Sequence, residues 1–188
     1  MSSSATSAAL LPAVAQGNVS AFEELYDRYA STVYGLLLRI LMNPEDAQEV
    51  LQETFVKAWT SAGMFDAVRG SEVAWLISIA RSRGIDRLRS RRTRADREDE
   101  AGREMSVFSA FVENATGADD AIQAEERRAV RGALAELPEA QRIALELAYF
   151  EGLSQTEIAE RLSQPLGTIK TRMQLGMKKM RERLTAFA

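Results

Sequence analysis

The 188-residue sequence contains neither cysteine nor histidine. Without cysteine there is no disulfide framework, and the absence of both residue types removes the usual zinc ligands and most nucleophile–base pairs of enzymes. Long apolar runs are also missing: Leu36–Met42 is far shorter than the roughly 18–20 residues that span a bilayer, and residues 1–6 lack the pattern of a signal peptide. We therefore expect a soluble, cytoplasmic protein that holds no metal or cofactor, acts on no small-molecule substrate and is not an enzyme.

Charge is distributed unevenly along the chain, although the net charge is only −3. Residues 63–95 carry eight bases and three acids, and residues 164–188 carry six bases and one acid. Between these two segments, residues 96–126 carry two bases and ten acids. Two basic surfaces separated by an acidic segment indicate that a polyanion is held at two places.

The strongest pattern lies in the last third of the chain, where two short helices are predicted on either side of a tight turn. Ser154 and Glu157 form a capping box for the first helix, and Pro165 suits the first turn of the second. Ser163 stands in the turn, where glycine is more usual. The residues of the second helix that face away from its apolar stripe or flank it are Thr168, Lys170, Thr171, Arg172, Gln174, Leu175, Lys178 and Lys179. This geometry is typical of a helix-turn-helix that reads a DNA major groove; the alternative is a helical hairpin with a solvated basic face.

The first third of the chain predicts two amphipathic helices. Ser20 and Glu23 form a capping box for the first. Asn43-Pro44 ends it and starts the second helix, with Asn43 as the N-cap. The face of the second helix opposite its apolar stripe is polar and acidic, and consists of Glu45, Gln48, Glu49, Gln52 and Glu53. A solvated outer face is the plainer interpretation, but because so many acids would repel DNA, contact with another protein is the functional alternative.

A turn-rich loop at residues 63–70 precedes a third predicted helix, which Ser71 is able to cap. This helix continues past Trp75 into seven arginines, which are Arg81, Arg83, Arg87, Arg89, Arg91, Arg92 and Arg94. Set against the nearby acid Asp86, they are too one-sided for ordinary salt-bridge pairing. Aromatics and arginines around a loop favour stacking and phosphate contact with single-stranded nucleic acid. The alternative is that Phe65 and Trp75 are core residues, which we favour for Trp75.

Helical periodicity fails from Asp96 to about Ala124, where acids, glycines and small residues mix. The sequence therefore predicts an all-α protein with two helical domains joined by a flexible acidic linker. The expected segments are an N-terminal tail at 1–20, a helical bundle at 21–92, the linker at 93–124 and a helix-turn-helix domain at 125–187.

Three motifs in order resemble the extracytoplasmic-function (ECF) group of bacterial sigma factors. The motifs stand at Ala47–Phe55, at Trp75–Ala80 with Ile85–Arg89, and at Leu137-Pro138 with Gly152–Arg172. In that family they bind RNA polymerase, meet the minus-ten promoter element and read the minus-thirty-five element, in that order. The resemblance runs from Phe22 to Leu184 and implies one domain like sigma region 2 and a second like sigma region 4.

The resemblance also implies three sets of contacts. The clamp helices of the largest polymerase subunit would be bound by Glu45, Gln48, Glu49, Gln52 and Glu53. Minus-ten DNA would meet Phe65, Asp66, Arg69, Ser82, Arg83 and Arg87, with the loop from Phe65 to Ser71 holding an extruded base. Minus-thirty-five DNA would meet Thr168, Lys170, Thr171, Arg172, Gln174, Leu175 and Lys178. Ser82 departs from the family pattern, which often has asparagine there.

The implied function is that of an alternative sigma factor, which binds core RNA polymerase and directs promoter recognition and transcription initiation in a stress or envelope response. The ending Leu175–Arg181 looks like that of a subgroup paired with membrane-anchored anti-sigma proteins, so a cognate anti-sigma factor is an expected partner. Two other classes stay open: an ordinary helix-turn-helix regulator, which binds duplex DNA tightly without polymerase, and an all-helical protein-interaction module whose basic faces are incidental. Carboxylate-based catalysis is a distant third.

Overall fold

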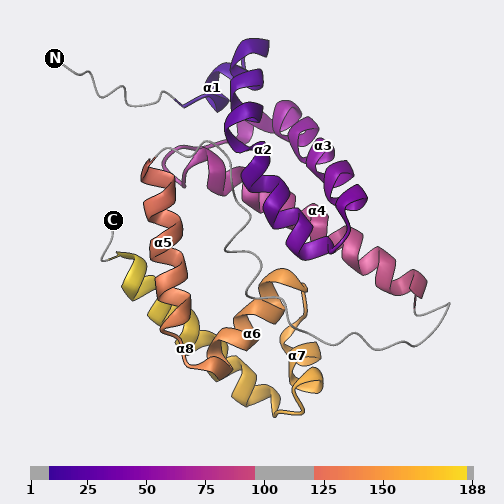
Figure 1. Ribbon diagram of the computed structural model, residues 1–188, viewed down its shortest axis with the longest axis vertical. Helices are drawn as coiled ribbons and strands as arrows, with labels where there is room; N and C mark the ends of the chain where they lie inside the picture. Colours follow the sequence, from indigo (N-terminus) through magenta and orange to yellow (C-terminus); the bar gives the residue numbers. More distant parts are fainter. Residues whose placement is uncertain (1–8, 96–120, 186–188) are drawn as a thin grey trace. The chain divides into compact units, whose positions relative to one another are not determined.

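The computed structural model describes residues 9–95 and 121–185 (Figure 1). Within these ranges every regular element is helical, which confirms the predicted all-α class. The elements are α1 (Leu11–Val14), α2 (Val19–Leu41), α3 (Pro44–Ser61), the 3-10 helix η1 (Ala62–Met64), α4 (Glu72–Ala95), α5 (Ala121–Ala135), α6 (Glu139–Phe150), α7 (Gln155–Arg161) and α8 (Leu166–Thr185). The chain divides into two compact units, Met1–Gly117 and Ala118–Ala188.

The N-terminal unit is a bundle in which α2, α3 and α4 each pack against the other two (Figure 1). Six of the seven residues predicted for the inner face of α3 are buried, namely Ala47, Val50, Leu51, Thr54, Phe55 and Ala58, and the seventh, Trp59, is half-buried. Gly84 of α4 lies directly against α2, where a Cβ atom at this position would come within 3.2 Å of Leu37 Cδ2. A glycine at this position therefore lets the backbone of α4 approach α2 closely.

The ends of α2 show one correct and one wrong prediction of a helix cap. At the junction with α3, the Asn43 side chain accepts the Asp46 N–H at 3.0 Å, as predicted. At the start of α2 the N-cap is Asn18, whose Oδ1 accepts the Ala21 N–H at 3.0 Å. The predicted Ser20 cap is wrong, because Asn18 satisfies a free N–H of the first turn and Ser20 lies inside the helix.

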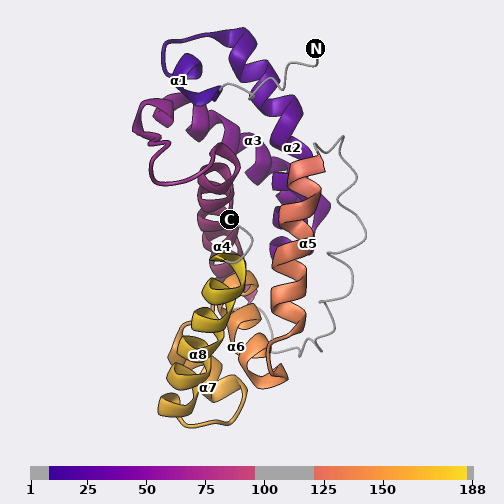
Figure 2. The same ribbon diagram turned by 90° about the vertical axis from the view of Figure 1, so that its left-hand side faces the viewer.

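A short helix, α1, lies in the segment that the sequence assigned to an N-terminal tail. Leu10, Leu11 and Val14 are buried, and α1 packs against α2 and η1 (Figure 2). A four-residue helix is too short to show a period in the sequence. Residues 10–17 therefore belong to the folded N-terminal unit rather than to a tail.

The C-terminal unit consists of α5, α6, α7 and α8. Its core is formed by buried residues of three helices, which are Ala144, Leu147, Ile158, Ala159 and Ile169. The predicted acidic linker at 93–124 overlaps helices at both ends, because α4 continues to Ala95 and α5 begins at Ala121. The remainder of that predicted linker, residues 96–120, lies outside the described residues.

Candidate functional site

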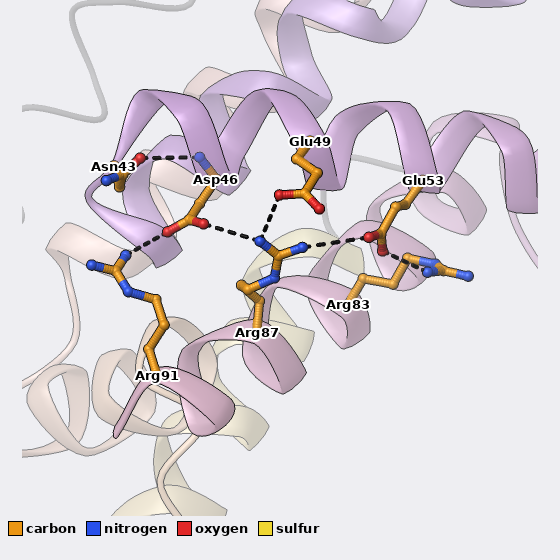
Figure 3. A network of polar contacts seen from close by, with 7 residues as sticks. All are labelled: Asn43, Asp46, Glu49, Glu53, Arg83, Arg87 and Arg91. Carbon is orange, nitrogen blue, oxygen red and sulfur yellow. Dashed lines mark hydrogen bonds and ion pairs between the residues drawn. The ribbon is translucent and has the colours of Figure 1, made fainter. Parts of the chain in front are cut away.

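Arg87 of α4 lies at the centre of an ion network between α3 and α4 (Figure 3). Its Nη1 is 3.0 Å from Asp46 Oδ1 and 2.8 Å from Glu49 Oε2. Its Nη2 is 3.5 Å from Glu53 Oε1. One guanidinium thus contacts three carboxylates that are spaced three and four residues apart, on one face of α3.

Two further arginines of α4 extend this network in both directions. Arg91 Nη1 donates to Asp46 Oδ2 at 2.6 Å, and Arg83 Nη1 donates to Glu53 Oε2 at 2.8 Å. Arg83, Arg87 and Arg91 are four residues apart, so they share one face of α4. Figure 3 shows this row of arginines opposite the row of acids on α3.

The protonation of the central pair reflects their contact. Hydrogen bonding from Arg87, together with its positive charge, holds the pKa of Glu49 below its ordinary value. In return, hydrogen bonding to Glu49 raises the pKa of Arg87 in spite of partial desolvation, and Asp46 adds to this effect. The Glu49 side chain is nevertheless 59% exposed, so solvent and salt screen its part of the network.

The network joins two surfaces that the sequence analysis treated as separate. Glu49 and Glu53 were predicted to bind polymerase, and Arg83 and Arg87 to contact minus-ten DNA; the structure pairs them with one another. The prediction that the arginines are too one-sided for ordinary salt-bridge pairing is wrong, because Arg83, Arg87 and Arg91 find their carboxylate partners on another helix. Sequence reasoning missed Asp46 and Arg91, although the spacing of each row, three and four residues for the acids and four for the arginines, is a usable signal. The other predicted polymerase-binding residues are Glu45, Gln48 and Gln52, and all three are exposed.

The loop between η1 and α4 is organised by its own backbone and by one aromatic contact. The Asp66 carboxylate accepts the Val68 N–H at 3.0 Å, and the Phe65 ring lies 5.9 Å from the Trp75 ring in an edge-on contact. Ser71 Oγ accepts the Ala74 N–H at 3.3 Å, which confirms the predicted cap of α4. Asp66 is therefore engaged in a turn, while the predicted DNA-contacting residues Arg69 and Ser82 are exposed.

The helix-turn-helix forms in the C-terminal unit as predicted. Ser154 Oγ accepts the Glu157 N–H at 3.3 Å, and the Glu157 carboxylate accepts the Ser154 N–H at 2.7 Å, which completes the capping box. Ser163 follows α7 with a φ of 50°, in the left-handed region. Ile169 of α8 is fully buried in the core of the unit, so the opposite side of α8 faces outward.

The outward side of α8 carries most of the residues predicted to meet minus-thirty-five DNA. Five of the seven are exposed, namely Lys170, Thr171, Gln174, Leu175 and Lys178. Thr168 is half-buried. Arg172 is also partly buried, and its Nη2 donates to Gln164 Oε1 at 3.2 Å. Because Gln164 belongs to the turn before α8, Arg172 braces this turn in the free protein.

Residues 9–95 and 121–185 contain no cluster of three or more side chains able to hold a metal ion. None of the helices described there is long and apolar enough to cross a membrane.

Comparison with known proteins assigns the two units to one family. The family described as Sigma-70 region 2 matches residues 25–94, and Sigma-70, region 4 matches residues 127–180. The ECF RNA polymerase sigma factor SigK of Mycobacterium sp. (strain KMS) is 40% identical over 169 residues, which are 90% of this chain and 86% of the relative. The chain belongs to the ECF RNA polymerase sigma factors.

Further comparisons place this sigma factor among relatives of similar length. The SigK of Mycolicibacterium vanbaalenii is 37% identical over 174 residues, which are 93% of this chain and 87% of the relative. Among solved structures, Rhodobacter sphaeroides SigE in complex with the anti-sigma ChrR is 31% identical, covers 92% of this chain and 94% of its own, and has a TM-score of 0.45. In this sigma factor the α3–α4 network lies within region 2, and the outward side of α8 lies within region 4.

Proposed function

We propose that this sigma factor binds core RNA polymerase through α3 and directs it to promoters through α4 and α8, and so starts transcription at a specific set of genes. The observation that carries the proposal is the exposed, basic outward side of α8, held on a helix-turn-helix in a chain that also contains region 2. The proposal assigns the protein no catalytic step and places it in the cytoplasm, with the polymerase.

The polymerase-binding surface is the acidic side of α3. Its members are Glu45, Gln48, Glu49, Gln52 and Glu53, and their proposed partner is the pair of clamp helices of the largest polymerase subunit. Glu45, Gln48 and Gln52 are exposed and offer a first contact. Glu49 and Glu53 form ion pairs with the arginines of α4. These pairs support a surface whose inner residues, Glu49 and Glu53, are neutralised and whose outer acid is Glu45.

The minus-ten surface comprises the loop from Phe65 to Ser71 and the adjoining side of α4. Its proposed members are Phe65, Asp66, Arg69, Ser82, Arg83 and Arg87. In this proposal the loop holds one extruded base, which costs about a few kcal/mol of unstacking. Arg83 and Arg87 reach backbone phosphates only when they exchange a carboxylate for a phosphate, since both are paired in the free protein. Arg69 is exposed and needs no such exchange.

The minus-thirty-five surface is the outward side of α8. Thr171, Gln174 and Leu175 are spaced three and four residues apart and are assigned to base edges. Lys170 and Lys178 flank them and are assigned to phosphates. Thr168 and Arg172 complete the proposed surface. In the free protein, Arg172 holds the turn before α8 through its hydrogen bond to Gln164.

We further propose that a cognate anti-sigma factor holds the protein inactive. The support is the resemblance of Leu175–Arg181 to a subgroup that is paired with membrane-anchored anti-sigma proteins. A complex of this kind would release the sigma factor when its signal arrives in a stress or envelope response.

Reconstituted transcription tests the proposal. Core polymerase is mixed with a library of genomic fragments, with and without this protein, and the transcripts are sequenced. We expect start sites that appear only with the protein and share an upstream element, and we expect core polymerase to be retained by the tagged protein. Tight binding of the protein alone to duplex DNA, with no new start sites, would instead identify an ordinary helix-turn-helix regulator.

A further inference from the structure

The short helix α1 touches both ends of the loop that precedes α4. At the start of the loop, α1 packs against η1. At its end, the Leu11 N–H of α1 donates to the carboxylate of Glu72, the first residue of α4, at 2.6 Å. Figure 2 shows α1 next to this part of the N-terminal unit. The contact joins residues that are 61 positions apart in the chain.

Glu72 is a buried acid that none of the surfaces proposed above uses. Only 7% of the residue is exposed, and a buried carboxylate is costly unless hydrogen bonds and opposite charges stabilise it. The Leu11 N–H supplies one such bond, and the amino end of α4 favours negative charge. Arg28 of α2 is also near: desolvation lowers the pKa of Arg28, but Tyr29, Glu24 and Glu72 together raise it.

The loop itself has few contacts that could hold it in place. The residues from Asp66 to Ser71 are exposed, and Val68 is 95% exposed. The hydrogen bonds described within the loop are local, from Val68 and Arg69 to Asp66. Apart from the ring contact of Phe65 with Trp75 at the first residue of the loop, its position is therefore set from its two ends, which are the places that α1 touches.

We propose that α1 and Glu72 form a clip that positions the loop from Phe65 to Ser71 for capture of the extruded minus-ten base. This inference rests on the proposed minus-ten function. Glu72 acts here as a positioning residue, through the loop, and touches no DNA. Leu11 and Val14 supply the buried side chains of the clip.

The test uses the complete holoenzyme and the non-template minus-ten strand of a promoter found in the transcription experiment. Two versions of this strand are compared, with a normal base or with an abasic site at the extruded position. For the unmodified protein we expect the normal strand to bind about tenfold or more tightly, as for a stacked base. Glu72→Ala should bring the ratio of the two affinities close to one and leave the affinity for the abasic strand unchanged.

Three further variants make this test specific. Glu72→Gln keeps an oxygen that accepts the Leu11 N–H, so it should restore most of the ratio. Val14→Ala loosens α1 without altering α4 and should lower the ratio as Glu72→Ala does. This variant tests the clip even if the Glu72→Ala protein does not fold. Asp27→Ala removes an exposed acid of α2 and is the matched control with an unchanged ratio.

The outcomes separate the clip from the function on which it rests. A normal ratio in both Glu72→Ala and Val14→Ala would overturn the clip. An equal loss of affinity for both strands would also overturn it, because that pattern shows a general loss of stability. If the unmodified holoenzyme does not distinguish the two strands, the proposed base capture fails first, and the clip fails with it.

Discussion

Ser163 occupies a backbone conformation that costs an L-residue roughly 1–2 kcal/mol. Its φ of 50° ends α7 and opens the turn of the helix-turn-helix. Glycine adopts this conformation without a steric penalty. A glycine also increases the conformational entropy of the unfolded chain, which offsets part of the stability gained from the relief of strain. The sequence pattern already marked this position as one where glycine is more usual.

We predict that Ser163→Gly stabilises the C-terminal unit by about 0.5–1 kcal/mol, because the relief of strain exceeds the added chain entropy. Denaturant unfolding of the two proteins measures the difference. Ser163→Ala is the control, since alanine keeps the Cβ atom and should give no gain. Equal stability of the glycine variant and the natural protein would show that the turn relaxes elsewhere.

The ionisation of Glu49 makes the stability contributed by the α3–α4 network depend on pH. Its folded-state pKa lies below its ordinary value because of Arg87, so its ionised form adds stability that is fully present at neutral pH. That stability is lost as the pH falls through the folded-state pKa. We predict that Glu49→Gln lowers the melting temperature at pH 7 and that the difference disappears well below the usual glutamate pKa of 4.5.

Thermal melts of both proteins across this pH range provide the measurement. Glu160→Gln, which removes an exposed acid in the other unit, controls for the change in net charge. A difference between natural protein and Glu49→Gln that stays constant with pH would contradict the assignment, because it would not follow the titration of a carboxylate.

At the scale of helices, the pairing of α3 with α4 changes what charge reversal should do. From the sequence alone, Glu49→Lys with Glu53→Lys should leave folding intact, because both acids lie opposite the apolar face of α3. In the structure, the new lysines would face Arg83 and Arg87 and remove their partners. We therefore predict a melting temperature lower by several degrees, with a smaller loss at high salt because salt screens the repulsion.

Two companion variants show whether the effect is specific. Gln48→Lys with Gln52→Lys adds positive charge to α3 away from the arginines and should melt close to the natural protein. Adding Arg87→Glu to the double reversal should recover part of the loss, since it restores opposite charges across the two helices. An unchanged melting temperature in the double reversal would show that the acids are structurally dispensable and available to polymerase.

Substitutions on the outward side of α8 should distinguish residues that read bases from residues that contact phosphates. Lys170→Ala should weaken binding to all sequences about equally and lower the salt slope by roughly one unit. Gln174→Ala should instead change which sequence is preferred, at a cost of about 1–3 kcal/mol at one base pair. Binding of the C-terminal unit to a panel of upstream-element variants at two salt concentrations measures both effects. A uniform loss for Gln174→Ala with an altered preference for Lys170→Ala would reverse the assignment.

The longer helices were predictable because their signals are local. Asn43-Pro44 and the Ser154–Glu157 capping box lie within four residues of the groups that they satisfy, and both form as predicted. Ser20 shows the limit of such signals, since two capping residues stood near one helix start and Asn18 was the one used. Local patterns identified the longer helices, although not always where they begin, and they missed the four-residue helix α1.

The α3–α4 network and the clip were not predictable in the same way. Arg87 and Glu49 are 38 residues apart, and Leu11 and Glu72 are 61 residues apart. Their contacts depend on how helices pack, and the charge pattern of one helix shows which face is charged but does not identify the helix that packs against it. Three arginines that looked unpaired along the chain are therefore paired across the bundle.

For the whole molecule, the division into two units predicts independent folding. Each unit buries its own set of side chains, including Leu25 and Leu76 in the first and Leu147 and Ile158 in the second. We predict that residues 1–117 and 118–188, produced as separate chains, each unfold cooperatively with the midpoint that the same unit has in the full chain. Circular dichroism melts of the three proteins test this. A C-terminal unit that unfolds without a transition would show that it depends on the rest of the chain.

The paired arginines of α4 also affect how unbound copies of the protein meet the chromosome. A genome offers about 10⁶–10⁹ competing sites, and binding to such sites comes almost entirely from lysines and arginines that displace counterions from phosphates. Arg83, Arg87 and Arg91 already hold carboxylates, so they add little to this background affinity. Copies that are not retained along bulk DNA remain free to diffuse, and they encounter a scarce partner such as polymerase sooner.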